Sequence, residues 1–67
     1  METQLLEQMA RKVIEMYVQM DDVTIKKLAD EINSVMSAKE GYSDDIRCIA
    51  SLLSGRVNGY VTRYIQN

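Results

Sequence analysis

The sequence predicts an all-α fold, a compact three-helix domain, and three observations lead to this prediction. The chain of 67 residues contains no proline and only three glycines, the two residue types that are least favourable inside helices. Its apolar residues recur at intervals of three and four positions, which is the spacing of one helix face. Polar stretches interrupt this pattern twice. Because a chain of this length accommodates one domain, we expect residues 1–67 to form a single helical interaction domain.

The first helix is expected at about residues 2–20. The apolar stripe along it comprises Leu6, Ala10, Val13, Tyr17 and Met20. Other apolar side chains, among them Met9 and Met16, widen this face beyond a normal stripe. A helix that is apolar over much of its circumference lies at the centre of its bundle or is shared with another chain. We therefore expect Met9 and Met16 to contact a partner.

The second helix is expected at about residues 24–38. Thr24 is a suitable N-cap, because its hydroxyl can accept a hydrogen bond from a free backbone N–H group in the first turn. Val23 and Leu28 occupy the two positions of a hydrophobic staple, which would fix the entry of the chain into the helix. The apolar stripe of this helix comprises Ile25, Leu28, Ala29, Ile32, Val35 and Met36.

The third helix is expected at about residues 44–65. Gly41 can adopt the left-handed conformation that ends a preceding helix, and Ser43 is a suitable N-cap. The apolar stripe comprises Ile46, Ala50, Leu53, Val57, Tyr60 and Tyr64. It continues without a break past two glycines, so we expect one continuous helix. The alternative is a helix that ends near Leu53, followed by a turn and a short strand at 60–65.

Small side chains gather on the face of the third helix that lies opposite its apolar stripe. They include Ser51, Gly55 and Gly59, with Leu52 at the border. Small residues allow the backbone of a second helix to approach closely, as is best known from membrane helices. We therefore expect these four residues to contact a twin subunit or a helix of another protein. The alternative is that the glycines are tolerated surface residues.

The small size of the chain also points to a partner. Chains below roughly 70–80 residues commonly rely on disulfides, a structural metal or oligomerisation. Cys48 is the single cysteine and there is no histidine, so neither an intramolecular disulfide nor a structural zinc site can form. We therefore expect a homodimeric helical bundle. The alternative is a monomer with an unusually well-packed core.

The composition favours a protein without catalytic machinery. No histidine is present to act as an acid or base, and no nucleophile has an evident activating partner. The acidic pairs match no metal-binding spacing, so we expect no enzyme activity, no small-molecule substrate, no cofactor and no metal. The N-terminus lacks the basic region of a secretory signal, and no apolar run approaches the roughly 20 residues of a membrane span. A cytoplasmic location is the resulting expectation.

The leading functional hypothesis is a small regulator or adaptor that acts through helix-mediated protein–protein interaction and self-association. It follows from the wide apolar face of the first helix and the small-residue face of the third. Both features are surfaces on which another helix can pack.

The alternative hypothesis is a helix-turn-helix-like transcriptional regulator that binds nucleic acid. Its binding residues would be the arginines of the C-terminal segment, Arg47, Arg56 and Arg63. The stretch Thr24-Ile25-Lys26-Lys27-Leu28-Ala29-Asp30-Glu31-Ile32 resembles the first helix of many helix-turn-helix domains, which implies that the third helix is the recognition helix. However, no glycine-containing tight turn follows Ala29, and the net charge of −2 contrasts with the basic excess of most nucleic-acid-binding domains.

Overall fold

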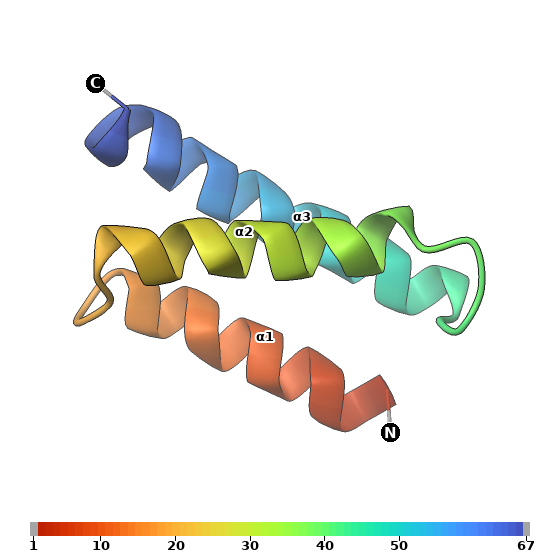
Figure 1. Ribbon diagram of the computed structural model, residues 1–67. Helices are drawn as coiled ribbons and strands as arrows, with labels where there is room; N and C mark the ends of the chain where they lie inside the picture. Colours follow the sequence, from red (N-terminus) through yellow and green to blue (C-terminus); the bar gives the residue numbers. More distant parts are fainter. Residues whose placement is uncertain (1, 67) are drawn as a thin grey trace.

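A computed structural model describes residues 2–66 of the chain, and it is helical throughout with short connections. Its elements are α1 (Glu2–Met16), α2 (Asp22–Ser37), α3 (Asp44–Tyr60) and the π-helix η1 (Val61–Ile65) (Figure 1). The prediction of a compact three-helix domain without strands is confirmed for these residues. Met1 and Asn67, which belong to the predicted domain, lie outside the described residues. Within residues 2–66, no helix combines the length and the apolar character that crossing a membrane requires.

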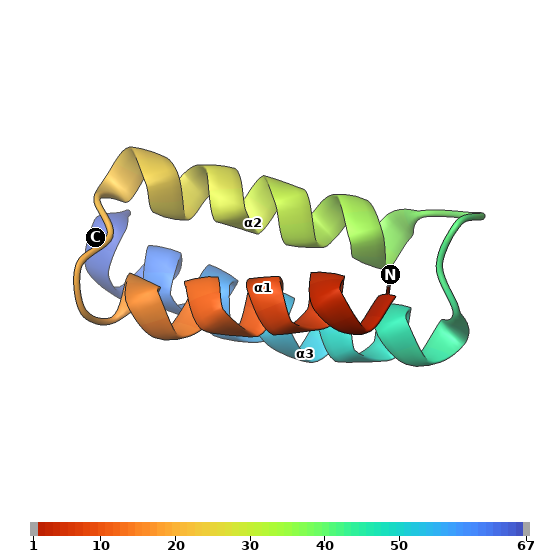
Figure 2. The same ribbon diagram turned by 90° about the horizontal axis from the view of Figure 1, so that it is seen from below.

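The three helices alternate in direction, so that α2 runs antiparallel to α1 and α3. The two views show α2 covering one side of the pair formed by α1 and α3 (Figures 1 and 2). Among the three α-helices, the packing between α2 and α3 is the most extensive and that between α1 and α2 the least. α1 and α3 run side by side in the same direction (Figure 1). At their C-terminal ends, the rings of Tyr17 and Tyr60 contact each other.

The core is built around the apolar stripe of α2. Its four buried residues are Ile25, Leu28, Ile32 and Val35, as the helical period predicts. The rest of the core comes from α1, α3 and η1 and comprises Met9, Val13, Met16, Ile46, Ala50, Val57 and Val61. Full burial of an aliphatic side chain is worth roughly 1.5–3 kcal/mol, so this cluster is the main source of hydrophobic stabilisation in the bundle.

The predicted apolar face of α1 is only partly right: Leu6, Ala10, Val13 and Met20 are buried or partly buried as expected, but the centre of the buried face lies elsewhere. Met9 and Met16, expected at an exposed flank, are 3% and 1% exposed and lie in the core. Tyr17, expected in the core, follows the last residue of α1 and is more than half exposed. Both registers contain Val13 and both follow intervals of three and four residues, so the pattern does not distinguish them. The observed register places two long, flexible methionine side chains where α1 meets α2 and α3 together, and such side chains fill irregular space well.

α1 also ends earlier than the predicted boundary near residue 20. After Met16, the backbone N–H of Tyr17 donates to the carbonyl of Ile14, three residues earlier, at 3.1 Å. This tighter hydrogen-bond pattern is frequent at helix ends. It allows the chain to reverse direction within a few residues, and it leaves Tyr17 and Val18 at the surface of the bundle.

α2 begins at a different N-cap from the one predicted. Asp21 has an extended backbone, and its carboxylate accepts the N–H of Thr24 at 3.2 Å, so Asp21 rather than Thr24 is the cap. The predicted staple between Val23 and Leu28 is wrong as well, because Val23 lies in the first turn and is exposed. An aspartate here satisfies a free N–H group and also places negative charge at the positive end of the helix dipole, which threonine does not.

The connection between α2 and α3 agrees with the prediction except at the end of α2, which is capped by Ala38 in an extended conformation, three residues before Gly41. Gly41 has a φ of +94°, a conformation that glycine adopts without a steric penalty. The Ser43 hydroxyl accepts the N–H of Ile46 at 3.3 Å and caps α3. Arg47, in the first turn of α3, donates to the carbonyl of Ala38 at 3.1 Å. The arginine thereby satisfies a carbonyl at the C-terminal end of α2.

α3 is continuous through Gly55 and Gly59, as predicted, and no strand follows it within the described residues. It passes into η1, where the N–H of Gln66 donates to the carbonyl of Val61 at 2.8 Å. A π-helix has wider turns than an α-helix, so successive side chains rotate by a smaller angle. Tyr64, predicted as a stripe residue, is exposed for this reason, whereas Val61 is buried.

A polar network that the sequence analysis did not anticipate connects α2 to α3. Ser54 is only 3% exposed. Its hydroxyl donates to the side-chain carbonyl of Asn33 at 2.8 Å and accepts from the side-chain amide of Asn58 at 3.1 Å. Buried polar groups are costly unless they are hydrogen-bonded. The network therefore favours the rotation and register of α3 in which Ser54 meets Asn33.

Replacing Ser54 with alanine should lower the free energy of unfolding by about 1–2 kcal/mol, because Asn33 and Asn58 lose the partner that they share. Urea unfolding followed by circular dichroism measures this change. Ser51→Ala is the matched control, since Ser51 lies on the same helix and is exposed. Its effect should stay within about 0.5 kcal/mol. Equal effects of the two substitutions would show that the network does not stabilise the fold.

The N-cap of α2 makes stability depend on pH in the acid range. Hydrogen bonds from the hydroxyl and the backbone N–H of Thr24 lower the pKa of Asp21 below its ordinary value of 3.8. A carboxyl whose pKa is lower in the folded state stabilises the fold fully above its unfolded pKa, and this contribution is lost as the pH falls through the folded pKa. Asp21→Asn keeps a capping side chain but does not titrate.

We therefore expect the stability advantage of the wild type over Asp21→Asn to shrink as the pH falls from about 5 to about 2. Urea unfolding at intervals across this range provides the measurement. A difference between the two proteins that stays constant with pH would contradict the prediction, since the capping carboxylate would then make no pH-dependent contribution.

Candidate functional site

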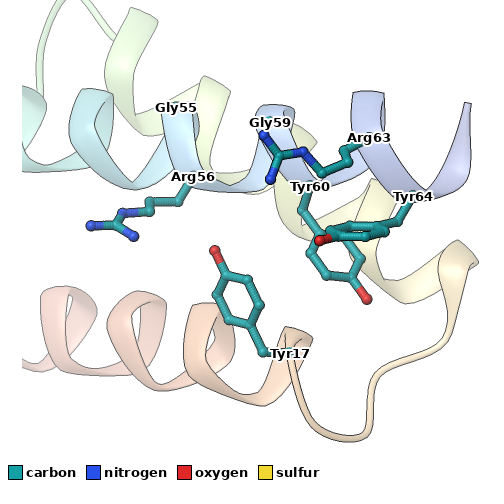
Figure 3. A pocket seen from close by; sticks show the side chains of 7 residues that line it. All are labelled: Tyr17, Gly55, Arg56, Gly59, Tyr60, Arg63 and Tyr64. Carbon is teal, nitrogen blue, oxygen red and sulfur yellow. The ribbon is translucent and has the colours of Figure 1, made fainter.

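An open groove of about 250 Å³ lies between the C-terminal ends of α1 and α3. Its residues come from the turn after α1, the last turns of α3 and η1. They are Tyr17, Gly55, Arg56, Gly59, Tyr60, Arg63 and Tyr64 (Figure 3). At this end of the bundle the edge-to-face contact of Tyr17 and Tyr60 connects the segment after α1 to α3.

Three tyrosine rings form the aromatic part of the groove. Tyr17 meets Tyr60 edge to face, with ring centroids 5.4 Å apart, and the centroid of Tyr60 lies 4.8 Å from that of Tyr64. Such pairs are worth about 0.5–1.5 kcal/mol beyond the apolar area that they bury. Tyr60 is half-buried, whereas Tyr17 and Tyr64 are more than half exposed. The cluster therefore holds the end of α1 beside α3 and still presents two rings to a ligand.

Two arginines make the groove positive. Arg56 and Arg63 both line it, along the side formed by α3 and η1 (Figure 3). None of the lining residues is acidic. Arg56 is exposed and forms no hydrogen bond or ion pair with the part of the chain that the structure describes. A guanidinium group in this situation can bind a carboxylate or phosphate with two parallel hydrogen bonds.

Two glycines leave the backbone of α3 bare along the groove. Gly55 and Gly59 are exposed, neither has a positive φ, and a Cβ added at either would meet nothing from other parts of the chain within 4 Å. The monomer therefore has no steric or conformational requirement for glycine at these positions. Inside a helix, glycine costs about 0.5–1 kcal/mol relative to alanine. The two residues weaken α3 and open its backbone to close approach.

The four predicted contact residues of the third helix are all exposed on α3. Gly55 and Gly59 line the groove, and Leu52 lies one turn before them with most of its side chain in water. Ser51 lies one turn before Gly55 on the same helix face, but it does not line the groove and instead borders a separate shallow hollow near the start of α3. The predicted surface is an exposed face of α3, and the groove covers only part of it.

The two methionines that the sequence predicts at a contact surface are not exposed. Met9 and Met16 are core residues, so the folded monomer does not offer them to a partner, and their predicted exposure is wrong. The exposed apolar residues near the end of α1 are instead Ile14, Tyr17 and Val18. The surplus apolar surface of this helix exists, but it consists of different side chains because the buried register is rotated.

The structure does not bring the three arginines of the nucleic-acid hypothesis together. Arg56 and Arg63 share the groove, as their spacing of seven residues predicts. Arg47 precedes Arg56 by nine residues, which places it about half a turn away around the helix. Its guanidinium pairs with Asp44 and donates to the carbonyl of Ala38. One face of the helix therefore carries two arginines rather than three.

The sequence did not predict the aromatic half of the groove. The spacing of apolar residues in the sequence assigns Tyr17, Tyr60 and Tyr64 to the apolar stripes of two helices. A signal for the α3 side was present, because Arg56, Tyr60 and Arg63 recur at intervals of four and three and so share one face. The contribution of Tyr17 had no such signal, since it depends on where α1 ends and on how α1 lies beside α3.

No protein-family model, curated protein or solved structure matches this chain. The groove is therefore interpreted from its own chemistry. Its hydrogen-bonding groups are guanidinium N–H groups and phenol hydroxyls, its walls are aromatic, and part of its surface is bare helix backbone. This combination suits a ligand that carries both negative charge and apolar surface.

Gly55→Ala and Gly59→Ala should each raise the free energy of unfolding by about 0.5–1 kcal/mol, because alanine lowers the conformational cost of the helix and meets no neighbour. Gly41→Ala is the control, since its φ of +94° penalises any side chain. That substitution should lower stability by about 1–2 kcal/mol. Urea unfolding of the three variants gives the values. A loss of stability at position 55 or 59 would contradict the conclusion that the monomer does not require these glycines.

Proposed function

We propose that this protein is a small non-enzymatic interaction module, a regulator or adaptor that binds other proteins and itself through helix packing. The observation that carries the proposal is the apolar surface that the bundle leaves uncovered near the end of α1. Ile14 and Val18 are 66% and 77% exposed there. Single exposed apolar residues are ordinary, but these two lie within four positions of each other around the end of α1, together with the exposed ring of Tyr17.

The energetics support self-association through this surface. Full burial of an aliphatic side chain is worth roughly 1.5–3 kcal/mol. A two-fold symmetric contact buries each residue twice, once from each copy. The contributions of Ile14 and Val18 are therefore doubled in a homodimer. A chain of this size, with one small core and no disulfide or zinc site, gains stability from such a contact.

Nucleic-acid binding is the alternative proposal and has weaker support. In a helix-turn-helix motif, two helices cross at about 90–120° after a turn of 3–4 residues. Here α2 and α3 run antiparallel and are connected by the longer segment 38–43 (Figure 1). The arginines of α3 and η1 are also divided between two faces, with Arg56 and Arg63 on one and Arg47 on the other.

Sedimentation equilibrium at micromolar concentrations tests the self-association. We expect a monomer–dimer equilibrium for the wild type. In the double variant with Ile14→Ser and Val18→Ser, the dissociation constant should rise at least about tenfold, because each 1.4 kcal/mol of lost contact corresponds to a factor of ten. Both side chains are exposed, so the variant should keep the helical circular dichroism spectrum of the wild type.

Val23→Ser is the matched control, because Val23 is an equally exposed aliphatic residue at the opposite side of the α1–α2 turn. It should leave the dissociation constant within about twofold of the wild-type value. A wild type that remains monomeric at every concentration, or a dimer that the double substitution does not weaken, would contradict the assignment of this surface to self-association.

A further inference from the structure

We infer that the groove between α1 and α3 is the docking site for an acidic, amphipathic helix of another protein. This inference rests on the proposed function, since it names the partner that the interaction module binds. The groove is distinct from the exposed aliphatic residues assigned to self-association, although Tyr17 adjoins both. Four observations support the inference: the positive charge of the groove, its shape, the poor fit of a second copy of this chain, and the residues that form the groove walls.

The positive charge of the groove favours a negatively charged partner. Arg56 and Arg63 line it and no acidic residue does. Arg56 has no hydrogen-bonded or ionic partner among the described residues. The chain as a whole carries a net charge of −2, so this positive region is a local exception. Complementary charge of this kind steers association and selects partners more than it adds affinity.

The shape of the groove suits a helix. Gly55 and Gly59 are four residues apart and expose the backbone of α3 along about one turn. Small residues at this spacing let a second helix approach closely. Above and below them, Leu52 and Tyr64 are exposed and provide apolar contact. An occupant with an apolar stripe and acidic residues beside it would meet the tyrosines with the stripe and the arginines with its carboxylates.

A second copy of this chain fits the groove poorly. A two-fold symmetric contact along the bare backbone would bring both pairs of Arg56 and Arg63 together, with no acidic residue among the lining to compensate. A contact in which the acidic turn at Asp21 and Asp22 entered the groove of the next copy would not be symmetric. Such head-to-tail contacts generate rings or open filaments rather than dimers. The occupant is therefore another protein.

The composition of the walls favours a protein over a nucleic acid. Two arginines are a small electrostatic footprint, since nucleic-acid-binding domains generally present a clear basic patch. The tyrosine rings also contact one another: Tyr60 lies between Tyr17 and Tyr64, which leaves less ring surface for stacked bases. A second helix can pack closely against backbone that glycine leaves exposed. Binding the phosphate backbone of a nucleic acid does not require such exposed helix backbone.

Selection from a displayed library of random peptides, each long enough for about four helical turns, tests the inference without a known partner. The bait is the full-length wild-type protein, and peptides that also bind Gly59→Leu are removed. That substitution places a larger side chain in the groove, and it should leave the fold intact because position 59 is exposed and a Cβ there would meet nothing from other parts of the chain within 4 Å. We expect enriched peptides with an excess of Asp and Glu and with apolar residues at intervals of three and four.

Titrations of the enriched peptide then locate the contact. Arg56→Gln and Arg63→Gln should each weaken binding about two- to fivefold, the range expected for an exposed ion pair. Gly59→Leu should weaken it at least about tenfold, because its side chain occupies the space of the partner backbone. Arg11→Gln is the matched control. It removes one exposed positive charge from α1 and should change affinity by less than about twofold.

Three outcomes would overturn the inference. The first is that no peptide is enriched, or that the enriched peptides are neutral or basic. The second is that Arg11→Gln weakens binding as much as Arg56→Gln, which would indicate a diffuse charge effect. The third is that duplex or single-stranded DNA binds more tightly than the peptide and loses affinity in the same arginine variants. If any of these occurs while the wild type still dimerises, the acidic partner is wrong and the proposed function stands; if the protein also remains monomeric, both fail.

Discussion

The burial of the α2 stripe is the contact on which the rest of the structure depends. Ile25, Leu28 and Ile32 have almost no exposed surface, and they are covered by α1 and α3 from two directions. No disulfide and no zinc site supplements this core, so the positions of the helices depend mainly on apolar packing, most extensively that of α3 against α2 and of α1 against α3. α1 and α3 run side by side (Figure 1), and the groove lies at their C-terminal ends, where Tyr17 meets Tyr60.

The rotation of α3 about its own axis determines what the groove contains. Ser54 is buried and hydrogen-bonded to Asn33 of α2, which fixes the side of α3 that faces α2. Neighbouring positions follow at about 100° per residue. Once Ser54 points inward, Gly55 and Gly59 must point outward, and Arg56 and Tyr60 must turn toward α1. One small polar contact on the inner face thereby sets the chemistry of the outer face.

The helices could be predicted from the sequence because each is marked by local chemistry. The Ser43 cap, the left-handed Gly41 and the unbroken stripe through α3 depend only on residues a few positions apart. The predictions that were wrong concern features that depend on packing between helices. Val13 belongs to two possible buried registers of α1, and only the positions of α2 and α3 decide between them. For the same reason, the sequence predicted the glycines and arginines of the groove as candidate binding residues. It did not predict Tyr17, which reaches the groove from the turn after α1.

Gly55 and Gly59 are the strongest indication that α3 contacts a partner. A chain of this size has roughly 3–10 kcal/mol of stability, and two helical glycines in place of alanine cost about 1–2 kcal/mol of it. Gly41 has a left-handed φ that accounts for its identity, whereas Gly55 and Gly59 have no positive φ and no close neighbour. Nothing inside the bundle offsets their cost. A backbone that another helix approaches would offset it, and the exposed rings and arginines beside these glycines are the groups that such a helix would meet.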